Sequence, residues 1–180
     1  MIIFLFGTWG CGKSFVGNMI HERCGILHIE ADLHFNKKML AALHQRKFHE
    51  LELEAYYDRV ISDIFGYQRR SRDFIVSQAI YYEYFRQMIF NCFSPDIHFA
   101  WVKTEDEYLQ KSRLRERATT GNPVTPEVYE YMKQYWEEPT LPHEILINDY
   151  TLEGQVKTFL DSLGLCVQWE KSSRLARLGV

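Results

Sequence analysis

The amino-acid sequence predicts an α/β fold in which a parallel five-stranded sheet is covered by helices on both faces. Short apolar runs alternate along the chain with longer segments of helical periodicity, and this alternation is typical of parallel sheets whose strands are joined by helices. The first run, Ile2 to Phe6, is apolar at every position, which indicates a strand buried on both faces. A glycine-rich segment follows it directly, at residues 7–14.

The same reading gives the order of the elements. Strands are expected over residues 2–6, 26–30, 73–77, 97–102 and 145–147. Helices are expected over residues 14–23, 37–46, 51–65, 82–93, 105–118, 126–136 and 152–163. Gly25, Gly66 and Gly164 stand at the ends of helical patterns, where glycine readily closes a helix. Pro126 suits a first helical turn, and residues 119–125 before it are expected to form a loop.

The composition indicates one globular domain without a general affinity for polyanions. The chain has 180 residues, 46% of them hydrophobic and 25% charged, and a net charge of −3, so neither nucleic acid nor a membrane surface is an expected partner. No apolar stretch approaches the roughly 20 residues of a membrane span, and the four cysteines lack the spacing of a metal site. We expect a cytoplasmic monomer or homodimer, with a domain over residues 1–164 and a tail over 165–180.

The glycine-rich segment carries the clearest chemistry. It reads Gly7-Thr8-Trp9-Gly10-Cys11-Gly12-Lys13-Ser14, which matches the phosphate-binding pattern GxxxxGK[ST] between a strand and a helix. Glycines let backbone N–H groups wrap phosphates, and the helix N-terminus adds partial positive charge. Lys13 should reach the terminal phosphates of ATP, and the Ser14 hydroxyl should ligate Mg²⁺. The expected nucleotide-binding residues in and after the loop are Gly7, Trp9, Gly10, Cys11, Gly12, Lys13, Ser14 and Phe15. The sequence therefore predicts the P-loop variant of the three-layer α/β fold.

A GTPase is excluded by the rest of the sequence. A GTPase carries the motif DxxG after a strand and the motif NKxD further along the chain. The two DxxG strings of this sequence, at residues 63–66 and 161–164, instead end helical patterns, and no NKxD follows them. A small-molecule kinase instead needs a carboxylate for the acceptor hydroxyl, cations for the transferring phosphoryl group and a lid against water. Asp32 follows the second strand, at the edge of the sheet where ligands bind, and Glu30 is its nearest competitor.

Arginines supply the expected cations. Arg113, Arg115 and Arg117 end the helix that leads into a glycine- and proline-containing segment, around residues 118–126, which we expect to be a small mobile lid. Residues 113 and 117 share a helix face while 115 points elsewhere. Arg113 and Arg117 are therefore predicted to bind the nucleotide, and Arg117 to act in catalysis together with Lys13 and Asp32.

Several further stretches resemble the gluconate kinase branch of the shikimate and gluconate kinase group. They are spread over most of residues 1–164 and are the loop GTWGCGKS, EADLHFNKKM at 30–39, VSQAI at 76–80, YFR at 84–86, SRLRER at 112–117 and WEEP at 136–139. The resemblance implies an ATP- and Mg²⁺-dependent kinase that phosphorylates a hydroxyl of a small acid. It also implies that Asp32, His34 and Arg86 bind the substrate.

One departure from that family concerns the acceptor. Tyr81, Tyr82 and Glu83 stand where the family carries lysines, so a neutral, aromatic or cationic acceptor is expected in an altered pocket. The histidines show no metal-binding spacing, and the basic run at residues 68–72 is interpreted as a solvated loop. The sequence thus predicts a kinase that transfers the γ-phosphoryl group of ATP to a small-molecule hydroxyl. A nucleoside or nucleotide kinase and a non-catalytic nucleotide-binding sensor are the alternatives.

Overall fold

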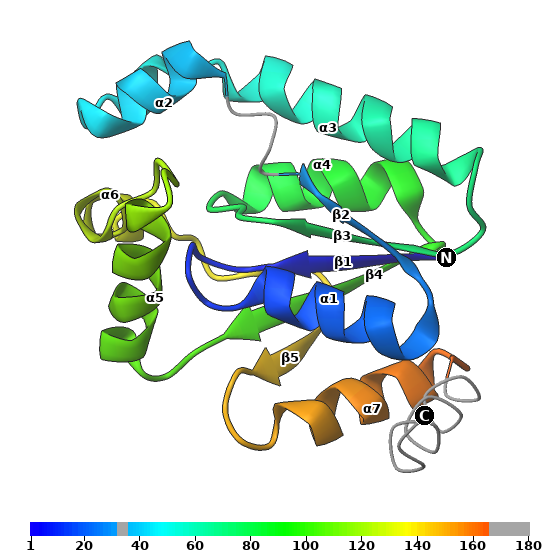
Figure 1. Ribbon diagram of the computed structural model, residues 1–180. Helices are drawn as coiled ribbons and strands as arrows, with labels where there is room; N and C mark the ends of the chain where they lie inside the picture. The colour runs from blue at the N-terminus through cyan, green and yellow to red at the C-terminus, as the bar shows by residue number, and fades with distance from the viewer. Residues whose placement is uncertain (32–35, 166–180) are drawn as a thin grey trace.

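The computed structural model describes residues 1–31 and 36–165. Its centre is one sheet of five parallel strands in the order β2-β3-β1-β4-β5 (Figure 1). The strands are β1 (Ile2–Phe6), β2 (Leu27–Glu30), β3 (Phe74–Gln78), β4 (Ile97–Lys103) and β5 (His143–Ile147). The helices are α1 (Lys13–Cys24), α2 (Lys37–His44), α3 (Leu53–Gln68), α4 (Glu83–Phe93), α5 (Glu107–Thr119), α6 (Pro126–Lys133) and α7 (Leu152–Ser162), with a 3₁₀ turn at Phe48–Glu50. The predicted α/β fold with a parallel five-stranded sheet is confirmed.

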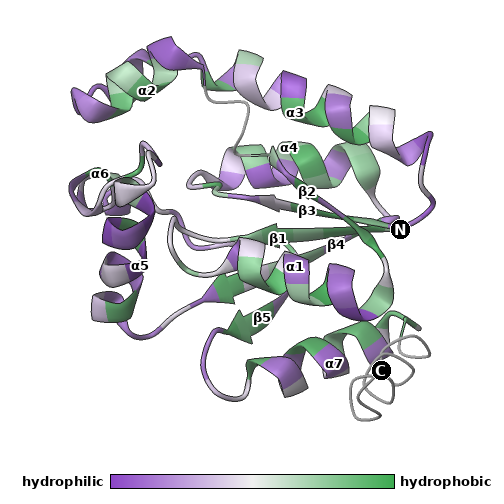
Figure 2. Ribbon diagram, viewed as in Figure 1, coloured by the Kyte–Doolittle hydropathy of each residue, from purple (hydrophilic) through white to green (hydrophobic). Residues whose placement is uncertain are grey.

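Strand β1 forms the middle of the core because its side chains serve both faces of the sheet. Ile2, Phe4 and Phe6 pack with α3 and α4, whereas Ile3 and Leu5 pack with α1 and α7. The strand pairs with β3 on one edge and with β4 on the other. Figure 2 shows the resulting pattern of hydrophobic strands between helices whose outer faces are hydrophilic. The three-layer arrangement follows from a strand that is apolar at every position.

A third cluster of buried side chains lies at the carboxyl ends of the strands, where α2, α5 and α6 gather (Figure 1). Trp9, which follows β1, packs there with Leu43 of α2, Leu114 of α5 and Met132 of α6. Helices α5 and α6 are also joined by ion pairs from Lys111 to Glu130 and from Lys133 to Glu107. This cluster fixes α2, α5 and α6 around the loop that follows β1.

Two predicted helix ends were wrong. Helix α3 continues through Gly66 to Gln68, and a β-carbon at Gly66 would have no atom within 4 Å, so this glycine neither closes the helix nor serves a close approach. Helix α6 ends at Lys133 rather than at residue 136, because Trp136 turns away to stack on Trp101 of β4. Gly25 does close α1, in the left-handed conformation with φ 69°.

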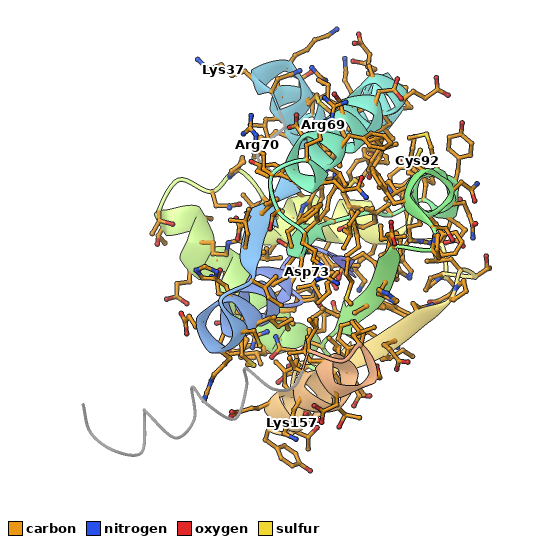
Figure 3. All side chains as sticks on the ribbon, turned by 90° about the vertical axis from the view of Figure 1, so that its right-hand side faces the viewer. Lys37, Arg69, Arg70, Asp73, Cys92 and Lys157 are labelled. Carbon is orange, nitrogen blue, oxygen red and sulfur yellow. The ribbon has the colours of Figure 1, made fainter. Side chains whose placement is uncertain are left out.

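The exposed parts of the chain add two findings. Arg69 and Arg70 lie in the exposed turn between α3 and β3, on the side of the molecule opposite α5 and α6 (Figures 1 and 3). The predicted C-terminal tail, at residues 165–180, lies outside the described residues from residue 166 onward. Among the helices that the structure describes, none combines the length and the apolar character that a bilayer crossing requires.

Candidate functional site

The loop between β1 and α1 forms the floor of the site. Its chain direction reverses through glycines with positive φ, among them Gly10 at 79° and Gly12 at 106°. Gly12 is the N-cap of α1, so the N-terminus of this helix opens into the space above the loop, as in phosphate-binding helices. Only glycine fits at Gly12, because a β-carbon there would run into Asn148. At Gly10 the positive φ, together with tight contacts to Leu114 and Gln110, disfavours a side chain.

Two buried amides hold the loop in this shape from opposite sides. Gln110 of α5 donates to the Thr8 hydroxyl at 2.8 Å and to the Trp9 carbonyl at 2.6 Å, and its carbonyl oxygen accepts a hydrogen bond from Tyr129 of α6 at 3.1 Å. Asn148, directly after β5, donates to the Cys11 carbonyl at 2.9 Å. The loop is therefore preorganised by residues that lie far from it in the sequence.

Lys13 is folded back over the loop. Its side chain is only 6% exposed, and its ammonium group donates to the Thr8 carbonyl at 2.9 Å. The Cys11 sulfur lies 4.0 Å from the same nitrogen. A buried ammonium group held at the start of a helix presents positive charge where a polyphosphate would lie.

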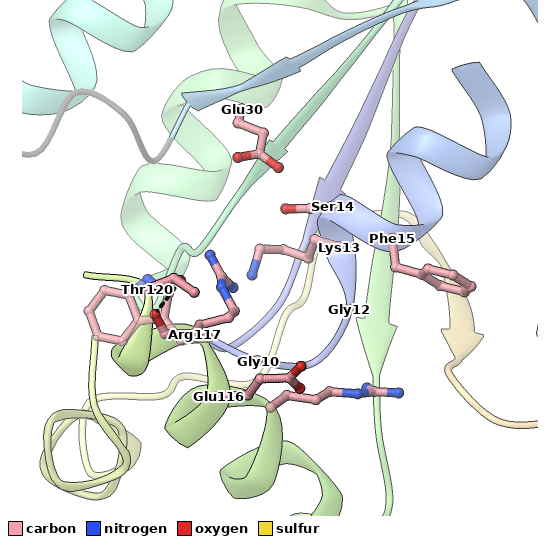
Figure 4. A pocket seen from close by; sticks show the side chains of 11 residues that line it. Gly10, Gly12, Lys13, Ser14, Phe15, Glu30, Glu116, Arg117 and Thr120 are labelled. Atoms are coloured by element: carbon pink, nitrogen blue, oxygen red, sulfur yellow. Dashed lines mark hydrogen bonds between the residues drawn. The ribbon is translucent and has the colours of Figure 1, made fainter. Parts of the chain in front are cut away.

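A pocket of about 550 Å³ opens above the loop. Its lining residues come from the loop, α1, the end of β2 and one face of α5: Trp9, Gly10, Gly12, Lys13, Ser14, Phe15, Glu30, Arg113, Glu116, Arg117 and Thr120. In Figure 4, Lys13, Ser14, Glu30 and Arg117 surround one space, whereas Phe15 points away from it. The volume lies within the range of ligand pockets in proteins.

The arginines of α5 lie as their helical spacing predicts. Arg113 and Arg117 line the pocket and Arg115 does not. Within the described residues, the Nη1 atom of Arg113 is buried without a hydrogen-bond partner. Burying a guanidinium nitrogen without a hydrogen-bond partner lowers the stability of the fold. An anionic or hydrogen-bonding ligand in the pocket would supply the missing partner.

Other predicted site residues lie elsewhere. Gly7 and Cys11 do not line the pocket, since Gly7 packs against the Val102 carbonyl and Cys11 lies in the core between the sheet and α1. Asp32 and His34 lie outside the described residues. Among the described residues, Glu30 is the carboxylate at the end of β2, and it lines the pocket.

Arg86 is fully buried and does not reach the pocket. Its guanidinium donates to Glu83 at 2.6 Å and to the carbonyls of Ile80 and Glu137, and it lies 5.1 Å from the ring centre of Trp136. In this structure Arg86 thus holds the start of α4 against the segment before β5. The expectation that it contacts the substrate came from the resemblance alone, and its contacts here give it a structural role.

The three residues that depart from the family, Tyr81, Tyr82 and Glu83, also have structural contacts. Tyr81 is buried against Trp9, and Tyr82 stacks on Phe48. Burial acts to raise the pKa of Glu83, but hydrogen bonds from Thr140, Gln87 and Arg86 outweigh it and lower the pKa to about 2. None of the three residues lines the pocket above the loop.

Sequence reasoning missed Gln110 and Asn148. The spacing of Gln110, Arg113, Leu114 and Arg117 places them on one helix face, so the face chosen for the arginines also contained Gln110. No comparable signal marks Asn148, because its contact with the loop depends on how β5 pairs with β4 at the far side of the sheet.

The donor set suits a magnesium ion. The Ser14 hydroxyl supplies a hard oxygen ligand in the same pocket as Lys13. Mg²⁺ prefers such oxygens, keeps several waters and is commonly held by one or two protein groups together with substrate phosphates. Ser14 would therefore hold it, together with those phosphates and waters.

Comparison with solved protein structures identifies proteins of the same fold. No protein-family model matches the sequence, and no curated protein matches it. Solved structures do match. A sugar kinase from Janibacter sp. HTCC2649 superposes with a TM-score of 0.71 at 14% identity, over 91% of this chain and 94% of the other.

Two further structures also match, and their names indicate kinases with different acceptor molecules. A gluconokinase from Sinorhizobium meliloti 1021 has a TM-score of 0.65 at 19% identity, over 99% of this chain and 97% of the other. The deoxyadenosine kinase of M. mycoides, with bound dATP, has a TM-score of 0.59 at 14% identity, over 91% of this chain and 100% of the other. The chain therefore has the fold of the P-loop small-molecule kinases, as predicted.

Proposed function

We propose that this protein is an ATP- and Mg²⁺-dependent kinase that transfers the γ-phosphoryl group to a hydroxyl of a small molecule. The observation that carries the proposal is the convergence on one pocket of Lys13 and Ser14 from α1, Glu30 from β2 and Arg117 from α5 (Figure 4). Two cations, a helix N-terminus and a carboxylate are the groups that phosphoryl transfer requires.

Each residue has a distinct task in this proposal. The loop and the N-terminus of α1 bind the β- and γ-phosphates, with Lys13 on the terminal phosphates. Arg117 stabilises the charge that develops on the transferring group, and Arg113 binds the nucleotide through the nitrogen that has no partner among the described residues. Ser14 holds Mg²⁺, which when bound neutralises phosphate charge.

A carboxylate at the end of β2 orients the acceptor hydroxyl and accepts its proton. Glu30 lines the pocket, and the sequence also offers Asp32 for this role. We propose Glu30, because its carboxylate shares the pocket with Ser14 and Arg117 in the described part of the chain. Replacement of each carboxylate by its amide decides between them.

The test is a transfer assay with γ-labelled ATP and a panel of sugar acids, nucleosides and small alcohols. Lys13→Ala should abolish transfer, and Glu30→Gln should reduce it on the order of 10²-fold while ATP binding stays within a few-fold. Arg69→Ala, in the turn on the opposite side of the molecule (Figure 3), is the matched control and should keep full activity.

Three outcomes would change the proposal. A strong loss in Asp32→Asn with none in Glu30→Gln would move the carboxylate role to Asp32. Transfer only to nucleosides would make the protein a nucleoside kinase. ATP binding without transfer to any acceptor would leave a nucleotide-binding sensor in place of an enzyme.

A further inference from the structure

A second cavity, of about 220 Å³, adjoins the nucleotide pocket and lies between α2, α5 and the segment that joins α5 to α6. The two spaces share Trp9, Ser14, Glu30 and Arg117 as lining residues. The groups proposed to act on the transferring phosphoryl therefore stand at their boundary. A molecule in the smaller cavity would meet a nucleotide in the larger one at this point.

The walls of the smaller cavity beyond the boundary are apolar. They consist of Leu40 and Leu43 from α2, Leu114 from α5, and Pro123 and Val124 from the joining segment. Leu43 and Leu114 are 2% and 0% exposed, so they belong to the packed cluster around Trp9. Because these walls are set by the core, their apolar character is a fixed property of the cavity.

Among the described lining residues, charged groups are found only at the boundary. Glu30 and Arg117 carry the charges among the described lining residues, and both also line the nucleotide pocket. Away from the boundary the polar lining residue is Asn122, whose side-chain oxygen already accepts a hydrogen bond from the Val124 backbone at 3.0 Å. Apart from the amide nitrogen of Asn122, these described walls offer no replacement for the hydrogen bonds to water that a carboxylate or a row of hydroxyls would lose there.

We propose that the acceptor is a small neutral alcohol with an apolar body. Its hydroxyl lies at the boundary beside Glu30, and its aliphatic or aromatic part packs against Leu40, Leu43 and Val124. The volume of about 220 Å³ equals about seven water molecules in liquid water, well below the nucleotide pocket beside it. The acceptor is thus neither a nucleotide nor an anionic sugar acid.

The chemistry balances without another reactant. The acceptor oxygen forms a bond to the γ-phosphorus of the nucleoside triphosphate, and the bond between that phosphorus and the β–γ bridging oxygen breaks. The hydroxyl proton passes to the carboxylate of Glu30, and the products are a phosphate monoester and the nucleoside diphosphate.

This inference rests on the proposed kinase function, so the experiment measures both. Full-length protein with MgATP is given 2-phenylethanol, 3-methyl-1-butanol, glycerol or gluconate, and phosphate-ester formation is followed beside ATP hydrolysis with water alone. We expect kcat/KM for the two apolar alcohols to exceed that for glycerol and gluconate at least tenfold. Preference for gluconate or glycerol would overturn the inference and leave the kinase function standing.

Two variants of α2 sharpen the test. Leu40→Lys places a cation in the cavity and should lower kcat/KM for the apolar alcohols at least tenfold. Ala41→Lys adds the same charge at the next, exposed position, which does not line this cavity, and should keep wild-type values. Thermal unfolding of both variants shows whether each is folded, and equal values for the two would overturn the inference.

The remaining outcomes are also decisive. If ATP is bound and hydrolysed but no apolar alcohol is phosphorylated or raises the unfolding temperature in the presence of ADP, the assigned acceptor class is wrong. If ATP is neither bound nor hydrolysed, the proposed kinase function itself is wrong.

Discussion

The side chain of Asn148 fills the space beside Gly12 that a β-carbon would need, while its amide donates to the Cys11 carbonyl one residue earlier. The glycine and the asparagine thus depend on one another. The phosphate loop can approach β5 only because Gly12 has no side chain, and Asn148 then fixes the backbone at that point.

Gly12→Ala should therefore damage both stability and nucleotide binding. The methyl group would clash with Asn148, and φ of 106° is unfavourable for alanine, so we expect a loss of about 2 to 4 kcal/mol in the free energy of unfolding. Denaturant unfolding and ATP titration measure the two effects. The double variant Gly12→Ala with Asn148→Ala should recover only part of the stability, since the strained φ remains.

Gly66→Ala is the matched control for this substitution. Its β-carbon would meet no atom within 4 Å in the interior of α3, so it should stabilise the protein by about 0.5 to 1 kcal/mol. Unchanged stability and ATP affinity in Gly12→Ala would contradict the packing described for Asn148.

Gln110→Ala should loosen the phosphate loop. It removes the hydrogen bonds to Thr8 and Trp9 and leaves the Tyr129 hydroxyl without this buried acceptor, so the free energy of unfolding should fall by about 2 to 4 kcal/mol. KM for ATP should rise while the ranking of acceptors stays the same.

This effect on KM should not vary between pH 6 and 9. Burial is the main cause that raises the pKa of Tyr129 to about 12, so the phenol stays protonated across that range.

Arg117→Ala and Arg115→Ala separate the two faces of α5. Both arginines are exposed, but Arg117 lines both cavities and Arg115 lines neither. Loss of the first should lower kcat on the order of 10²-fold, as expected for a group that stabilises transition-state charge. Loss of the second should change it less than twofold. Steady-state kinetics with the preferred acceptor provides the comparison, and similar rates for the two variants would remove Arg117 from the mechanism.

Glu83→Gln should destabilise the protein in a pH-dependent way. The pKa of Glu83 is lowered in the folded state from 4.5 to about 2, so its ionisation stabilises the fold fully at neutral pH, and this contribution is lost as pH falls from about 5 to about 2. Since one pKa unit corresponds to about 1.4 kcal/mol, the effect at pH 7 is at most about 3 kcal/mol.

Urea unfolding of wild type and Glu83→Gln at pH 7, 5 and 3.5 should show a difference that shrinks toward acid. Glu144→Gln, at an exposed position of β5, controls for the loss of one negative charge. A difference that is constant with pH would show that the carboxylate is not held by the hydrogen bonds from Thr140, Gln87 and Arg86.

The nucleotide half of the site could be predicted from the sequence because its information is local. The strand, the glycine-rich loop and the helix are contiguous, so Lys13 and Ser14 follow from a pattern of eight residues. The spacing along α5 likewise separated Arg113 and Arg117 from Arg115.

The apolar cavity beside that pocket could not be predicted because it is assembled from distant segments. The separation of Glu83 and Arg86 by three residues on a helix was a usable signal that the two side chains form an ion pair. The sequence does not reveal that this ion pair is buried. Nor does it reveal that Leu40 of α2 and Val124 before α6 line one cavity, because that depends on tertiary packing.

The position of β1 also governs how the chain can be made. It is made before the other strands of the sheet, yet its neighbours are β3 and β4, which end at Gln78 and Lys103. Until Lys103 has emerged, an all-apolar segment has an open edge and can associate with other chains. Slow passage of the ribosome before that point, or too little chaperone, would then reduce the soluble yield, so expression conditions would affect the amount of protein obtained more than its activity.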